Sequence, residues 1–107
     1  MPREKFKTLT EQMFYILLCL CRERRGVDVL EEVRSMTDGR VGIGSGTLYD
    51  LLELFAKEGA IRETRADGRR RSYIITDKGR QMLEREYGRL RRQAADYDRV
   101  LRQEESR

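Results

Sequence analysis

Residues 45–75 read SGTLYDLLELFAKEGAIRETRADGRRRSYII, and this stretch decides the fold. Its first half carries apolar residues at helical spacing, which are Leu48, Leu51, Leu52 and Phe55. Ser45 is placed to cap the N-terminus of this helix. Lys57 in the last turn, followed by Gly59, is typical of a helix end. We therefore expect a helix between Ser45 and Gly59.

The second half of the stretch predicts a β-hairpin. The pair Asp67–Gly68 lies between the β-compatible segments 60–65 and 70–75, and an Asp-Gly pair in this setting indicates a tight turn. Five arginines lie between residues 62 and 71 against two acidic residues, a local balance of +3. The hairpin is therefore the most basic short segment of the chain.

Two helices are predicted before this stretch. In the first, Met13, Ile16, Leu17 and Leu20 have helical spacing. Thr10 is its expected N-cap, and the helix is expected to end near Arg25–Gly26. The second is expected to begin at Asp28, whose distance from Glu31 is that of a capping box, and to stop at Asp38–Gly39. Four glycines between residues 37 and 46 predict a loop after it.

A long helix is predicted after the hairpin, capped by Thr76 or Asp77 and running toward Glu104. Its apolar residues alternate spacings of four and three, a heptad seam made of Leu83, Tyr87, Leu90, Ala94, Tyr97 and Leu101. A helix of roughly 28 residues spans about 42 Å, which is longer than one small domain covers. Packing on its own domain is the alternative, but the length of the seam favours pairing with a second subunit.

The order of three helices, a hairpin and a long helix predicts a winged helix-turn-helix, an α+β fold that is mainly α. Residues 1–76 would form a DNA-binding domain and residues 77–107 a dimerisation helix. The helix after the glycine-rich loop would enter the major groove, and the hairpin would be the wing. The predicted DNA-binding residues are Ser45, Gly46, Thr47, Tyr49, Asp50, Glu53 and Lys57 on the helix and Arg69, Arg70 and Arg71 on the wing.

Two features keep another interpretation open. A charged hairpin tip also occurs as a solvated edge that resists aggregation. Asp50 and Glu53 would repel phosphate, unless they accept hydrogen bonds from cytosine. The alternative function is a protein-interaction module on a winged-helix scaffold that does not bind DNA.

Composition narrows the classes of function. The net charge of +4 and the pI near 9.3 permit binding to a polyanion. The sequence has no histidine and two cysteines, Cys19 and Cys21, so a zinc site is not expected, nor any other metal or cofactor. Reduced cysteines, with neither a signal peptide nor a membrane span, predict a cytoplasmic protein. Nothing in the sequence has the pattern of an enzyme active site.

The segments Gly46-Thr47-Leu48-Tyr49 and Glu58-Gly59-Ala60-Ile61, with Gly68 to Tyr73 and Ile75 to Gly79, resemble the PadR family of transcriptional regulators. The resemblance covers roughly Leu9 to Leu83 and is greatest to the short subfamily with a single C-terminal helix. It implies a homodimer joined through its first and last helices, so Phe14 and Leu17 are added to the predicted interface. It further implies a repressor that a small aromatic or drug-like effector releases from DNA. The two-fold axis of a dimer paired along the last helix would suit a palindromic operator in double-stranded DNA.

Overall fold

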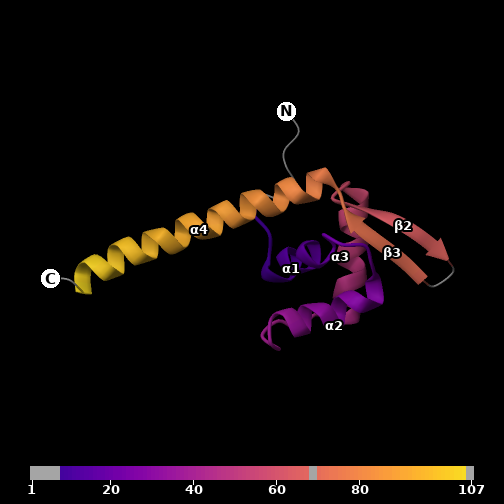
Figure 1. The fold of residues 1–107 in the computed structure, drawn as a ribbon, viewed down its shortest axis with the longest axis horizontal. Coiled ribbons are helices and arrows are strands. Elements are labelled where there is room, and N and C mark those ends of the chain that lie inside the picture. The colour runs from indigo at the N-terminus through magenta and orange to yellow at the C-terminus, as the bar shows by residue number, and fades with distance from the viewer. Residues whose placement is uncertain (1–7, 68–69, 106–107) are drawn as a thin grey trace.

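The computed structural model describes residues 8–67 and 70–105. Its elements are α1 (Glu11–Cys19), β1 (Arg24–Arg25), α2 (Gly26–Met36), α3 (Ser45–Lys57), β2 (Ile61–Asp67), β3 (Arg70–Ile75) and α4 (Asp77–Glu105). Figure 1 shows α1, α2 and α3 gathered beside the hairpin, while α4 runs away from them to the C-terminus. The predicted winged helix-turn-helix with a long C-terminal helix is confirmed.

The three strands form one antiparallel sheet in the order β1-β3-β2. The predicted end of the first helix near Arg25–Gly26 is wrong, because α1 ends at Cys19 and the chain then forms β1. Arg24 and Arg25 of β1 lie opposite Tyr73 and Ser72 of β3. This pairing is a tertiary contact, and such contacts override the local helical preference.

Two of the four predicted N-caps are confirmed in the described helices. Thr10 Oγ1 accepts a hydrogen bond from the backbone N–H of Met13 at 3.1 Å, and Thr76 Oγ1 accepts one from Gly79 at 3.2 Å. The other two predicted caps are wrong. Arg25 is the N-cap of α2, so Asp28 lies inside the helix, and Gly44 is the N-cap of α3, which makes Ser45 its first helical residue.

The core lies where the three short helices meet the sheet and the start of α4. Its fully buried side chains include Ile16, Leu17, Leu20, Val29, Val33, Leu48, Leu52, Phe55 and Ile61. Full burial of one such side chain stabilises the fold by about 1.5–3 kcal/mol. The predicted inner face of α3 is confirmed, with Leu51 half-buried at its border. This packing fixes the direction in which the opposite face of α3 points.

The first turns of α4 pack on this core, whereas the rest of the helix projects from it. Met82 and Glu86 are buried, but every residue from 91 to 103 is exposed. At 29 residues the helix is about 43 Å long. The projecting half therefore presents its apolar residues to solvent in the single chain.

Candidate nucleic-acid interface

The outer face of α3 is fully available to a partner. Every residue predicted to contact DNA from this helix is exposed: Ser45, Gly46, Thr47, Tyr49, Asp50, Glu53 and Lys57. Tyr49, which has the bulkiest side chain of this set, is 48% exposed. The division into an apolar inner face and a polar outer face is thus as predicted.

The N-terminus of α3 is suited to meet a phosphate group. Its first turn consists of Ser45, Gly46 and Thr47, three small exposed residues that follow the N-cap Gly44. Backbone N–H groups in the first turn of a helix lack acceptors within the helix, and the helix dipole adds positive charge there. An anion such as a DNA phosphate can therefore approach the backbone closely at this end.

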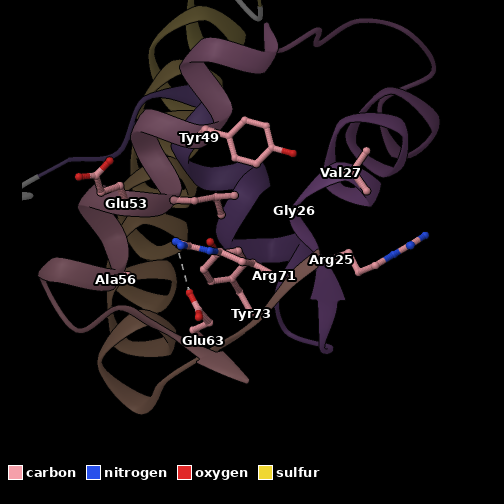
Figure 2. Close-up of a pocket in the computed structure, with 10 residues that line it drawn as sticks. Arg25, Gly26, Val27, Tyr49, Glu53, Ala56, Glu63, Arg71 and Tyr73 are labelled. Atoms are coloured by element: carbon pink, nitrogen blue, oxygen red, sulfur yellow. Dashed lines mark ion pairs between the residues drawn. The ribbon is translucent and has the colours of Figure 1, made fainter. Parts of the chain in front are cut away.

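A groove of about 710 Å³ lies between α3 and the hairpin (Figure 2). Its lining residues are Tyr49, Leu52, Glu53 and Ala56 of α3, Glu63 of β2, Arg71 and Tyr73 of β3, Arg25 before α2, and Gly26 and Val27 at the start of α2. The outer face of α3 and the hairpin therefore share one surface. This is the geometry that a helix in the major groove flanked by a wing requires.

The groove contains charges of both signs. Arg71 Nη1 lies 3.8 Å from Glu63 Oε2 across the two strands of the hairpin, as the dashed line in Figure 2 marks. Arg25 forms an ion pair with Asp28 at 3.0 Å, and its hydrogen bond to this carboxylate raises the pKa of the arginine. Both cations lie beside acids, so the surface is less positive than its arginines alone would make it.

The wing is described in part. Arg71 is 62% exposed at the edge of the groove. Arg70 is placed in β3, whereas Arg69 lies outside the described residues. Arg62 and Arg65 of β2 are exposed as well. The basic character expected of the hairpin is therefore present on its described strands.

Gly26 allows Tyr49 to lie close to the start of α2. A Cβ atom at this position would come 3.2 Å from Cε1 of Tyr49 and 3.1 Å from Cδ1 of Leu52. Figure 2 shows the Tyr49 ring pointing from α3 toward α2. Sequence reasoning missed Arg25 and Gly26 as parts of the surface, because their place depends on β1, whose two residues have no recognisable pattern. It missed Glu63 because the way the hairpin faces α3 is a tertiary relationship.

The family comparison shows to which kind of protein this surface belongs. The family described as "Transcriptional regulator PadR-like family" matches residues 16–85. The chain belongs to this family. It is accordingly a DNA-binding transcriptional regulator and not an enzyme, and the resemblance inferred from the Gly46 to Tyr49 and Gly68 to Tyr73 segments is confirmed.

Solved structures of PadR-like proteins have the same fold. A PadR-like regulator from Bacillus cereus is 25% identical, with a TM-score of 0.67, covering 84% of this chain and 90% of that one. A PadR family regulator from Eggerthella lenta is 20% identical, with a TM-score of 0.69 and coverages of 84% and 80%. A transcriptional regulator from Clostridium thermocellum is also 20% identical, with a TM-score of 0.69 and coverages of 85% and 96%. The comparison with curated proteins found no match.

This PadR-like chain has a second candidate surface, along α4. Four seam residues are large and exposed, Tyr87 by 52%, Leu90 by 42%, Tyr97 by 65% and Leu101 by 39%, and Ala94 is exposed between them. Val100, 48% exposed, lies beside the seam and was missed, because the positions one and two heptads before it are Gln93 and Glu86. Together these residues form an apolar stripe that runs along the projecting half of the helix.

The predicted interface residues near the domain differ in burial. Leu83 and Phe14 are half-buried against the core. Leu17 is completely buried in the core of its own chain, so its placement at a subunit interface is corrected. Phe14 also lines a pocket of about 200 Å³ with Leu9, Thr10, Glu11, Tyr15, Glu86, Arg89 and Leu90. This pocket adjoins the first residues of the exposed stripe.

Further features of the described residues concern metal binding, the two cysteine thiols and membrane spanning. Within residues 8–67 and 70–105, no group of three or more His, Cys, Asp or Glu side chains is arranged to hold a metal ion. Cys19 and Cys21 are free thiols, and burial raises the pKa of Cys19 to about 11, so this thiol is protonated at neutral pH. None of the described helices is long and apolar enough to span a bilayer.

Proposed function

We propose that this PadR-like regulator is a homodimeric repressor that binds a palindromic operator through α3 and the arginine-rich hairpin. Residues 1–76 would bind DNA and residues 77–107 would join the subunits. The observation that carries the proposal is the groove in which Tyr49 and Glu53 of α3 face Arg71 and Glu63 of the hairpin. A duplex seated on α3 would then also meet the wing.

The roles follow from the chemistry of each side chain. The first turn of α3 and Tyr49 would contact phosphates, with Lys57 adding a cation at the far end of the helix. Asp50 and Glu53 would face base edges, where a carboxylate accepts from cytosine N4. Arg69, Arg70 and Arg71 would reach phosphates or the minor groove beside the site of α3.

The seam of α4 supports the dimer. Its apolar side chains are exposed in the single chain, and a second copy related by a two-fold axis would cover them with an identical stripe. Such an axis would set the two copies of α3 about 34 Å apart, one helical turn of DNA, and so favour an operator with inverted half-sites.

A small aromatic effector is proposed to act at this interface. The pocket beside Phe14 and Tyr15 opens next to Leu90, and the partner's seam would bring further apolar groups to it. An aromatic ligand there would pack against these rings. Because the pocket joins α1 to α4, its occupancy would change how the two DNA-binding units are spaced.

The test is a fluorescence anisotropy titration with a labelled duplex from the regulator's own promoter region, at several salt concentrations. Replacing Arg69, Arg70 and Arg71 by alanine should lower the affinity and flatten the dependence of log K on log salt by up to about 0.9 per lost phosphate contact. The matched control replaces Arg92, Arg99 and Arg102 of α4 by alanine, which removes the same charge far from the groove. Absence of binding at low salt, or equal effects of the two triple variants, would contradict the proposal.

Repression is tested separately from binding. In an in vitro transcription assay with the same promoter, the protein should reduce the transcript, and the wing variant should reduce it less. An increase of the transcript would identify an activator instead.

A further inference from the structure

The hairpin contains an irregularity at Thr64. Glu63 lies opposite Tyr73, but Arg65 lies opposite Ser72, so Thr64 is the extra residue of a β-bulge. A bulge bends its strand and increases the local twist. The part of β2 beyond Thr64 therefore points in a direction that the bulge determines.

A hydrogen bond across the sheet holds the bulged residue. Thr64 Oγ1 donates to Glu23 Oε2 at 2.8 Å, and the two residues are 41 positions apart in the sequence. Glu23 directly precedes β1, which occupies the edge of the sheet opposite to β2, with β3 between them. The bond therefore ties the two outer edges of the sheet together over the central strand.

This tie lies at the root of the segment that carries the wing arginines. β1 pairs with β3 at Tyr73 and Ser72, level with the bulge, while Ala66 and Asp67 of β2 pair with Arg71 and Arg70 farther out. Two strands alone form a marginally stable hairpin, so the third strand adds support where it pairs. The direction of the outer part of the hairpin is consequently set by the bulge at Thr64.

We propose that Glu23 and Thr64 are positioning residues that aim the arginine-bearing end of the hairpin at the DNA bound by α3. They act through Arg71 and its neighbours and do not themselves contact the duplex. The inference rests on the proposed function, because the direction of the hairpin affects DNA binding only if the hairpin contacts DNA. The bond also contributes to the stability of the sheet, because it joins residues 41 positions apart in the sequence.

The test replaces Thr64 by valine, which keeps the β-branched shape and removes the hydroxyl. Thr64→Val should lower operator affinity by about 3- to 10-fold and reduce the salt slope by about 1, the effect of one weakened phosphate contact. Thr64→Ser keeps a hydroxyl and should bind as the unsubstituted protein does. Glu23→Ala should reproduce the defect and Glu23→Gln, which keeps an acceptor, should relieve it, so the inference can be tested even if one variant folds poorly.

A double-variant cycle distinguishes aiming of the wing from general destabilisation. When Arg69, Arg70 and Arg71 are already alanine, Thr64→Val should have no further effect on affinity. An equal loss in both backgrounds, or unchanged affinity and salt slope in Thr64→Val, would overturn the inference. If the triple alanine variant itself binds as tightly as the unsubstituted protein, the proposed function fails. If the triple alanine variant binds more weakly but Thr64→Val and Glu23→Ala bind as the unsubstituted protein does, the proposed function is retained and the aiming role is refuted.

Discussion

The buried carboxylate of Glu86 in α4 accepts a hydrogen bond of 3.2 Å from the backbone N–H of Leu9, which joins the segment before α1 to the third turn of the long helix. Arg89 donates to both oxygens of the same carboxylate. Glu86 is 4% exposed, an unusual burial for a glutamate, and such a charge is stable only when it is paired and hydrogen-bonded. This site connects the proposed DNA-binding domain to the proposed dimerisation helix.

Stability should therefore fall in acid through Glu86. The hydrogen bond from Arg89 lowers the pKa of this carboxyl below its ordinary value of 4.5, burial opposes the shift, and the Leu9 N–H reinforces it. Because the folded-state pKa is the lower one, the stabilisation is complete above pH 4.5 and is lost as the pH falls below that value. Urea unfolding between pH 7 and pH 3 measures this loss.

Glu86→Gln should remove much of this acid sensitivity and cost about 1–3 kcal/mol at pH 7, because charge-assisted hydrogen bonds are lost. Glu84→Gln, an exposed residue of the same helix, removes an equal charge and should leave the acid sensitivity in place. Identical pH profiles for Glu86→Gln and the unsubstituted protein would refute the assignment.

Gly79 should not tolerate any side chain. A Cβ atom there would lie 2.2 Å from the carbonyl oxygen of Ala60 and 2.6 Å from Cγ1 of Ile75, which no rotamer change relieves on the backbone side. Gly79→Ala should therefore destabilise the fold by about 2 kcal/mol or more, the range of overpacked cores. Gly88 of the same helix is the control, because its Cβ would meet a movable Arg92 side-chain atom at 3.4 Å. Gly88→Ala should raise the free energy of unfolding by about 0.5–1 kcal/mol in the same denaturation assay.

Removing the acid beside Arg71 should tighten DNA binding. The Glu63 carboxylate pairs with this arginine at 3.8 Å and adds negative charge to the groove. A partly exposed pair is worth about 0.2–1 kcal/mol, so Glu63→Gln should raise affinity up to about 5-fold, most strongly at low salt. Asp96→Asn breaks a comparable surface pair with Arg99 on α4 and should leave affinity unchanged. Weaker binding by Glu63→Gln would show that the pair holds Arg71 in a productive position.

The sequence predicted the elements whose signals are local. The apolar spacing in α3 and α4, the two strands on either side of Gly68 and the Thr10 and Thr76 caps each depend on residues within a few positions, and all of them agree with the described strands and helices. β1 could not be predicted, because its two residues are defined by pairing with Tyr73 and Ser72 almost fifty positions later.

The candidate site follows the same division. The exposed face of α3 follows from helical periodicity, so the exposure of Tyr49 and Glu53 could be predicted. The contributions of Arg25 and Glu63 depend on how the start of α2 and the hairpin face α3, and the Thr64 bulge depends on a hydrogen bond to Glu23. The prediction that Leu17 lies at a subunit interface is wrong, because helical periodicity does not distinguish a side chain buried in the core of its own chain from one that packs against a second subunit.

Two neighbouring alanines allow the dimer to be tested with little change in the fold. Ala94 lies on the seam of α4 and Ala95 lies next to it, about 100° farther around the helix; both are exposed in the single chain. Replacing either by aspartate has the same intrinsic cost to the helix, but only Ala94→Asp would place a charge between the two apolar stripes of a dimer. Size-exclusion chromatography with light scattering should give a dimer for Ala95→Asp and a monomer for Ala94→Asp. Ala94→Asp should also lose most of its affinity for a two-half-site operator, because two linked DNA-binding units bind far more tightly than one. A dimer that persists in Ala94→Asp, or that dissociates equally in both variants, would place the subunit interface elsewhere on the molecule.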